Sequence, residues 1–247
     1  MPQPDTGKTV LTGLRVYAKS LLGLELTDEQ LGRFSGFTDL LLEWNQRMNL
    51  TGITEPAEIA VRHFLDSLTL TLVVPRFDGL RLIDVGTGAG FPGLVIAIMF
   101  PDAHVTLLDS TGKKLRFAEH VCDALGVGNA RTLHARAEEA GKQKPHREVY
   151  DVVTARAVAR MPALMEYTLP LAKIGGQVIA MRGTEAYDES NRAARAISEL
   201  GGELFAIEDI QLPTLSNPRH LVVIDKIAAT PRRYPRNAGT PERQPIL

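Results

Sequence analysis

A short segment between Ile83 and Gly93, IDVGTGAGFPG, holds the residues best suited to bind a cofactor. It follows an apolar run typical of a strand and precedes a run typical of a helix. Glycines at such a junction allow a tight turn, and they let a ligand come close to backbone N–H groups. The segment therefore predicts a site for a nucleotide-like cofactor. Its glycines are Gly86, Gly88, Gly90 and Gly93.

The last three of these glycines also fit a dinucleotide site. They satisfy the spacing G-x-G-x-x-G, and Asp109 ends the next apolar run. A carboxylate at about that distance takes the ribose diol of a nicotinamide dinucleotide. A nicotinamide-dependent oxidoreductase is therefore an alternative interpretation of the segment.

Side chains beside the glycines favour a cofactor without phosphate. Asp84 stands immediately before the turn, where its carboxylate would repel a diphosphate but could accept a hydrogen bond from an amino group. Phe91 and Pro92 lie where a pyrophosphate would need open N–H groups of the helix. S-adenosylmethionine has an ammonium group, a sulfonium and a ribose diol but no phosphate, so it suits Asp84 at one end and Asp109 at the other.

Four short motifs occur in a specific order: D-V-G-T-G-A-G-F-P-G, L-L-D-S, R-A-E-E and T-A-R-A-V-A. In this order and spacing they resemble the RsmG family, also called glucose-inhibited division protein B, the guanine-N7 methyltransferases of small-subunit (16S) ribosomal RNA. The resemblance extends upstream to EWNQRMNLTGI and RHFLDSL, and downstream to RHLVVIDK and YPRNAGTP. It covers the chain from about Leu26 to the C-terminus, whereas residues 1–25 match nothing in the family.

The resemblance implies a class I S-adenosylmethionine-dependent methyltransferase that modifies N7 of a specific guanine in 16S ribosomal RNA, either free or in the small subunit. It also implies a cofactor over the carboxyl ends of the strands, which agrees with the general rule for open α/β sheets. Family contacts carry over to Gly86, Phe91, Ala137, Glu138 and Arg156. With the residues read above, the predicted cofactor site is Asp84, Gly86, Gly88, Phe91, Asp109, Ala137, Glu138 and Arg156.

Two of these side chains have alternative roles. Glu138 follows the third predicted strand, where it could read the adenine edge or simply place a charge at the start of a helix. Arg156 follows the fourth strand, where it could hold the cofactor carboxylate or bridge it to an RNA phosphate.

The expected chemistry needs no general base. Guanine N7 carries a lone pair and no hydrogen, so attack on the sulfonium methyl leaves no proton to remove from the nucleophile. We therefore predict a mechanism of alignment and electrostatic support, with no catalytic residue. The six histidines and one cysteine are scattered without the spacing of metal ligands, so no metal site is expected.

Other methyl acceptors would leave different signatures. Methylation of an amino group typically comes with an Asn/Asp-Pro-Pro-aromatic motif, and Asn217-Pro218-Arg219 lacks its second half. Methylation of cytosine C5 needs a cysteine nucleophile. Cys122 lies in the middle of a predicted helix, where a small buried hydrophobe is typical. Alternatives that remain are a methyltransferase for another RNA or a small molecule, and a non-catalytic RNA-binding module.

An RNA substrate requires basic surface, and basic residues concentrate in two parts of the chain. Residues 131–160 contain seven Lys/Arg against four Asp/Glu, and residues 219–247 contain six against two. The family usually has Lys where this chain has Arg182, which weakens the case for a direct RNA contact there. The candidate RNA-binding residues are Lys113, Lys114, Arg160, Arg182, His220, Arg232 and Arg233.

Composition agrees with a globular protein. The chain has 247 residues, of which 44% are apolar and 23% charged, and its net charge is −1. A lone cysteine excludes an intrachain disulfide. No secretory signal or membrane-length apolar run is present. We therefore expect a soluble, cytoplasmic monomer.

The elements that must position the site form three zones. Residues 1–76 are predicted helical, with apolar residues at gaps of three and four after a cap at Thr27, and a second helix after Pro56. Residues 77–228 alternate seven short apolar runs with helical stretches, which predicts an α/β domain with a mostly parallel sheet. The last two runs, around Ile207 and Val223, are joined without a helix, which predicts an antiparallel edge pair. Residues 229–247 are predicted to be an extended, basic, proline-rich tail without regular helix.

Overall fold

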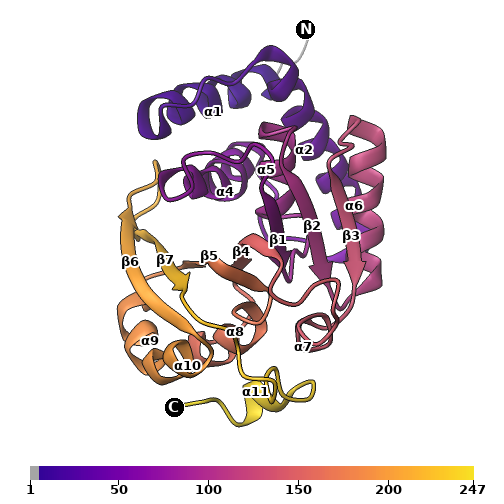
Figure 1. Cartoon of the computed structure of the whole chain (residues 1–247). Coiled ribbons are helices and arrows are strands. Elements are labelled where there is room, and N and C mark those ends of the chain that lie inside the picture. Colours follow the sequence, from indigo (N-terminus) through magenta and orange to yellow (C-terminus); the bar gives the residue numbers. More distant parts are fainter. Residues whose placement is uncertain (1–5) are drawn as a thin grey trace, which may run out of the picture.

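The computed structural model describes residues 6–247 and has one sheet of seven strands at its centre (Figure 1). The strand order is β3-β2-β1-β4-β5-β7-β6, and β7 is antiparallel to both of its neighbours. The predicted mostly parallel sheet with its antiparallel edge pair is therefore confirmed. The strands are β1 (Arg81–Val85), β2 (His104–Asp109), β3 (Ala130–His134), β4 (Tyr150–Arg156), β5 (Ala172–Arg182), β6 (Gly202–Ile210) and β7 (Arg219–Lys226).

Helices precede the sheet and cover both of its faces (Figure 1). The N-terminal helical segments are α1 (Thr6–Leu22), α2 (Asp28–Met48), α3 (Pro56–Ile59), η1 (Ala60–Leu65), α4 (Asp66–Leu68) and η2 (Thr69–Leu72). The later helices are α5 (Gly93–Met99), α6 (Gly112–Leu125), α7 (Ala137–Ala140), α8 (Met161–Thr168), α9 (Ala186–Arg192), α10 (Ala194–Glu199) and α11 (Thr240–Arg243).

Helix α2 begins at the predicted cap. The Thr27 hydroxyl accepts a hydrogen bond from the Gln30 N–H, and the Gln30 side chain accepts one from the Thr27 N–H. This reciprocal pair satisfies two free donors of the first turn. The predicted apolar stripe is buried at Phe34, Phe37 and Leu41.

The helix predicted after Pro56 is present, but its hydrogen-bonding pattern is not uniform. It continues from Pro56 to Leu72 through four segments, of which the second, η1, is π-helical. Such wider turns are frequent at functional sites. Segment η1 carries Arg62 and His63, and it faces the edge of the sheet described below.

Alternating side chains divide the interior into two clusters, one on each face of the sheet. Leu82 of β1 belongs to the cluster that includes Phe64 and Phe117 of the N-terminal helices and α6. Its neighbour Ile83 belongs to the cluster formed with α8, α9 and α10. The N-terminal helices therefore pack directly on the sheet and on α5 and α6. The predicted zone boundaries near residues 76 and 228 stay predictions.

The C-terminal segment, residues 229–247, differs from the extended tail predicted for it. Instead of an extended tail without helix, it packs against α8 and forms the single turn α11 (Figure 1). Tyr234 and Ile246 are buried in the second cluster. Arg236 forms a forked ion pair with Glu166, which is fully buried on α8. Proline prevented only a long helix; apolar anchors and this ion pair fix the segment.

Residues 6–247 contain no helix that is long and apolar enough to cross a membrane. The same described residues contain no group of three or more histidine, cysteine or acidic side chains placed to hold a metal ion.

Candidate functional site

The glycine-rich segment forms the turn from β1 to α5, as predicted. Gly86 has a φ of +70°, a conformation that glycine adopts without strain. A Cβ at Gly86 would lie 2.6 Å from a methyl group of Val158, which follows β4. At Gly88 a Cβ would meet only the Gly86 carbonyl oxygen, at 3.9 Å. The turn is therefore tightly packed behind Gly86 and open at Gly88.

Asp84 holds this turn together from inside. Its carboxylate is fully buried, and Oδ2 accepts hydrogen bonds from the Thr87 hydroxyl at 2.6 Å and the Gly93 N–H at 2.8 Å. Burial raises the pKa of Asp84 to about 6, against the opposing effect of these hydrogen bonds. The other oxygen, Oδ1, is buried and has no hydrogen-bond partner among the described residues. The structure thus gives Asp84 a role in shaping the turn, and its direct contact with a cofactor stays a prediction.

Several N–H groups around the start of α5, where a pyrophosphate would bind, are already hydrogen-bonded. The N–H groups of Gly90 and Phe91 both bond to the Thr87 carbonyl oxygen, and the Gly93 N–H bonds to Asp84. Pro92 has no N–H. Dinucleotide sites bind pyrophosphate through free N–H groups at this position. These occupied donors weigh against the dinucleotide interpretation.

Three adjacent strands bring the other predicted contacts to the same edge. Asp109 ends β2, next to β1, and its carboxylate accepts from the Gly88 N–H at 3.0 Å and the Thr111 N–H at 2.8 Å. Glu138 lies on α7 after β3, is 4% exposed, and accepts from the Gly239 N–H at 2.7 Å. Ala137 begins the same helix. The Asp109 carboxylate therefore contacts the turn directly, whereas the Glu138 carboxylate is bonded to the C-terminal segment.

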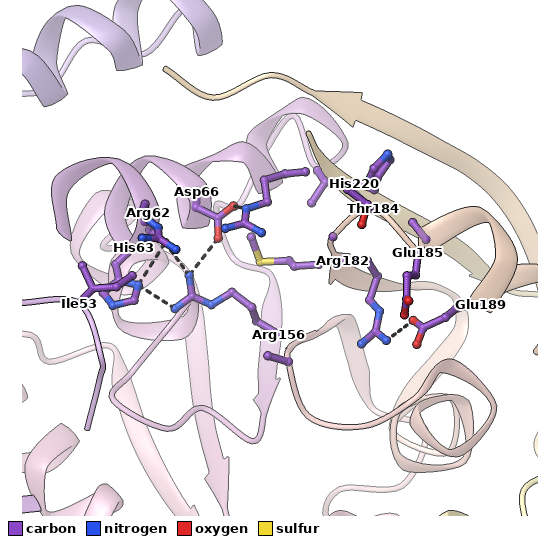
Figure 2. A pocket seen from close by; sticks show the side chains of 16 residues that line it. Ile53, Arg62, His63, Asp66, Arg156, Arg182, Thr184, Glu185, Glu189 and His220 are labelled. Atoms are coloured by element: carbon purple, nitrogen blue, oxygen red, sulfur yellow. Dashed lines mark hydrogen bonds and ion pairs between the residues drawn. The ribbon is translucent and has the colours of Figure 1, made fainter. Parts of the chain in front are cut away.

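Phe91 and Arg156 connect the turn to the N-terminal helices. The Phe91 ring is buried and stacks on Phe37 and on His63, with ring centroids 5.1 and 4.5 Å apart respectively. The Arg156 guanidinium lies 5.2 Å from the Phe91 ring centroid. Arg156 also donates to Asp66 at 2.9 Å (Figure 2). The predicted apolar wall at Phe91 is therefore part of an aromatic cluster that also involves η1 and α2.

A cavity of about 580 Å³ opens beside Arg156, at the edge of the sheet where β4 and β5 end and β7 begins (Figure 2). Segment η1 forms its opposite wall. Its titratable lining residues are Arg62, His63, Asp66, Arg156, Arg182, Glu185, Glu189, Arg219 and His220. This cavity and the glycine-rich turn meet at Arg156, so a cofactor and a second ligand could lie in contact.

A model of the family GidB, described as rRNA small subunit methyltransferase G, matches residues 30–222. The chain belongs to this family. A ribosomal RNA small subunit methyltransferase G from Lactobacillus johnsonii is 45% identical over 235 residues, covering 94% of this chain and 98% of the relative. This match extends into residues 1–25, so the expectation that those residues match nothing in the family is wrong. A protein of the same name from Roseiflexus castenholzii is 47% identical over 225 residues, covering 91% and 95%.

The fold also matches solved methyltransferases. A SAM-dependent O-methyltransferase from Thermotoga maritima is similar with a TM-score of 0.52 and 16% identity, over 77% of this chain and 72% of that one. At this identity the likeness shows the fold alone, which is the class I methyltransferase fold. Together with the GidB family, it identifies the chain as an S-adenosylmethionine-dependent methyltransferase.

Two of the seven candidate RNA-binding residues line the cavity. Arg182 lines it but is already bound, since it pairs with Glu189 and donates to the Ala159 carbonyl oxygen. His220 lines it and is 4% exposed. The other candidates lie outside the lining of the cavity: Lys113, Lys114, Arg160, Arg232 and Arg233.

Three lining residues were missed by the sequence analysis: Arg62, Asp66 and Arg219. Asp66 is buried between Arg156 and Arg219, at 2.9 and 3.7 Å from their nitrogen atoms. Arg62 and Asp66 lie in RHFLDSL and Arg219 lies in RHLVVIDK, two segments that carry the family resemblance. Nothing local in the sequence shows that residues so far apart meet at one carboxylate.

His63 is neutral in this environment. Its ring lies 2.8 Å from the Thr51 hydroxyl and stacks on Phe91, while Asp66 pairs with arginines instead. Burial, and then the charge of Arg156, lower the pKa of His63 from 6.5 to about 3. We expect its ring protons to show no titration by NMR between about pH 8 and 5, because this whole range lies above the lowered pKa of His63. A midpoint near 6.5 would contradict the burial described here.

The lowered pKa of His63 makes the stability of the fold depend on pH. The unfolded chain binds a proton at His63 near pH 6.5, whereas the folded chain binds it only near pH 3. This histidine therefore stabilises the fold above pH 6.5, and that contribution is lost as the pH falls towards 3.

Proposed function

We propose that this protein transfers the methyl group of S-adenosylmethionine to N7 of a specific guanine in 16S ribosomal RNA. The observation that carries the proposal is the pairing of a glycine-rich turn, in which the Gly90, Phe91 and Gly93 N–H groups are already hydrogen-bonded, with an adjoining cavity rich in arginine. The relatives named ribosomal RNA small subunit methyltransferase G support the choice of RNA. The choice of guanine N7 rests on the family resemblance.

The residues at the turn fit the cofactor. In this proposal Asp109 binds the ribose diol, whose hydroxyl groups would compete with the hydrogen bond that its carboxylate accepts from the Gly88 N–H. Ala137 and Glu138, at the start of α7, bind the adenine in this proposal. Gly86 and Gly88 let the cofactor approach the backbone closely, and Asp84 keeps the turn in the required shape. The unpartnered Oδ1 of Asp84 adds a buried acceptor beneath the site.

S-adenosylmethionine supplies an electrophilic methyl group on a positively charged sulfur. As the N7–CH₃ bond forms, the S–CH₃ bond breaks, and the positive charge passes from sulfur to the base. No proton leaves N7, so the protein has to align the two molecules and exclude water. Arg156 is fixed by Asp66 at the boundary between the turn and the cavity, where it holds both ligands in register.

The side chains near the reaction agree with a mechanism without a base. The depressed pKa of His63 keeps it neutral, and its ring is used by Thr51 and Phe91. Cys122 lies on α6, and burial raises its pKa to about 11, so its thiol is a poor nucleophile at neutral pH. A single substitution that abolished methyl transfer while leaving both cofactor and RNA affinity intact would contradict this mechanism.

The proposal is tested by mapping methylated guanines in ribosomal RNA from cells with and without the gene. We expect one N7-methylguanine of 16S RNA to disappear in the deletion strain and to return with a plasmid copy. An unchanged 16S RNA with a lost methyl group in another RNA would favour the alternative substrate. Loss of no RNA methyl group would point to a small-molecule acceptor or a non-catalytic RNA-binding module.

A further inference from the structure

The arginine-lined cavity contains more positive than negative side chains. Four arginines line it, against the three acids Asp66, Glu185 and Glu189. Asp66 is shared between two arginines, and Glu189 is bound by Arg182. The excess of positive charge favours an anionic ligand.

Unsatisfied polar atoms also gather in this cavity. Six buried side-chain nitrogen or oxygen atoms have no hydrogen-bond partner in the described part of the chain. Three of these six belong to residues of the cavity lining: Arg62 Nε, Arg219 Nε and His220 Nδ1. Buried polar groups are nearly always partnered, because an unmade hydrogen bond costs about 1–3 kcal/mol. The concentration of three in one place indicates groups that a ligand satisfies.

The four arginines differ in what they can still bind. Arg156 donates to Asp66 and to the Arg62 carbonyl oxygen, and Arg182 donates to Glu189 and to the Ala159 carbonyl oxygen. Arg62 donates to Glu58 only at 3.4 Å, and the Arg219 Nε lies 3.7 Å from Asp66, beyond hydrogen-bond distance. Both arginines have an Nε without a hydrogen-bond partner, and their side chains are 39% and 30% exposed. These two are therefore the arginines available to an incoming anion.

The side chains that line the cavity suit a whole nucleotide better than a phosphate alone. Guanidinium groups match phosphate oxygens with a planar fork of donors. The lining also includes the apolar side chains Ile53, Met181 and Leu221, which suit the face of a base. In helical RNA, N7 lies in a deep and narrow groove, so the target guanine has to lie in a loop or be extruded from its stack before it can enter a pocket.

We propose that the cavity takes one extruded nucleotide of the RNA, and that Arg62 and Arg219 hold its phosphate. Asp66 is a positioning residue that orients Arg219 and Arg156 towards the two ligands. This inference rests on the proposed function, since it names the residues that hold the substrate of the same site.

The test compares Arg62→Gln and Arg219→Gln with Arg195→Gln. Arg195 is a control of equal charge, because it lies on α10 outside the cavity lining and its side chain is 71% exposed. For each variant we would measure the KM and kcat for 16S RNA or small subunits, whichever the wild type methylates. The affinity for S-adenosylmethionine is measured by calorimetry, and folding is checked by circular dichroism.

We expect each cavity variant to raise the KM for RNA about 10-fold, the loss expected for one charged hydrogen bond. The dependence of RNA affinity on salt should flatten by about 0.7 in log–log slope, as for one phosphate contact in single-stranded RNA. The affinity for S-adenosylmethionine should stay within about twofold of wild type.

Two results would overturn the inference. Either the cavity variants match Arg195→Gln in KM and salt slope, or they lose cofactor affinity as strongly as RNA affinity. A wild-type enzyme that methylates no 16S RNA would instead refute the proposed function. Failure of the inference and failure of the proposed function therefore give different results.

Discussion

Gly86→Val reduces the affinity for S-adenosylmethionine by about 100-fold, if the turn binds the cofactor as proposed. The φ of +70° strains any residue with a Cβ, and a β-branched side chain most of all. A Cβ at this position would also lie 2.6 Å from a Val158 methyl group. The turn would have to move away from β4, which displaces the backbone that the cofactor approaches. Calorimetric titration of the variant measures the effect.

Gly79→Val is the matched control for this experiment. Gly79 has a φ of +71°, and a Cβ there would meet nothing within 4 Å. The control variant therefore introduces similar backbone strain before β1 without a clash. We expect it to lower the melting temperature while leaving cofactor affinity unchanged. Equal cofactor affinity in Gly86→Val and Gly79→Val would show that the cofactor does not bind at this turn.

Arg236→Ala is expected to cause the largest loss of stability, about 2–3 kcal/mol. It would leave the Glu166 carboxylate, which is fully buried on α8, without its forked partner. The magnitude is set below that of a fully buried pair because the Arg236 side chain is 27% exposed. Thermal unfolding should show a drop of roughly 5–10 °C for a domain of this size.

Arg233→Ala provides the comparison within the same segment. Arg233 pairs with Glu199, but its side chain is 68% exposed, so we expect only a small change in melting temperature. Similar melting temperatures for Arg236→Ala and Arg233→Ala would mean that the C-terminal segment is not anchored by the buried ion pair.

The sequence predicts the sheet well because its signals are local. All seven apolar runs predicted within residues 77–228 became strands, and the runs around Ile207 and Val223 form the antiparallel pair β6 and β7. Runs rich in Val, Ile and Leu separated by helices specify a buried parallel sheet. The cap at Thr27 was likewise visible, because both halves of its hydrogen-bond pair lie three residues apart.

The sequence predicts the substrate side of the site less well. The meeting of Asp66, Arg156 and Arg219 joins three distant segments, and no local pattern announces it. The roles of Asp84 and Arg182 also depend on partners that only folding brings together. The C-terminal segment was misjudged for the same reason, since the partner that anchors Arg236 lies 70 residues earlier.

The most direct test is methyl transfer in vitro from S-adenosylmethionine carrying an isotope-labelled methyl group. The purified protein is incubated with 16S RNA and, separately, with small ribosomal subunits, and the nucleosides are identified by mass spectrometry. We expect label in 7-methylguanosine at one position of 16S RNA, and far less label with Gly86→Val at a cofactor concentration near the wild-type affinity. Label in any other nucleoside, or equal labelling by Gly86→Val, would contradict the account.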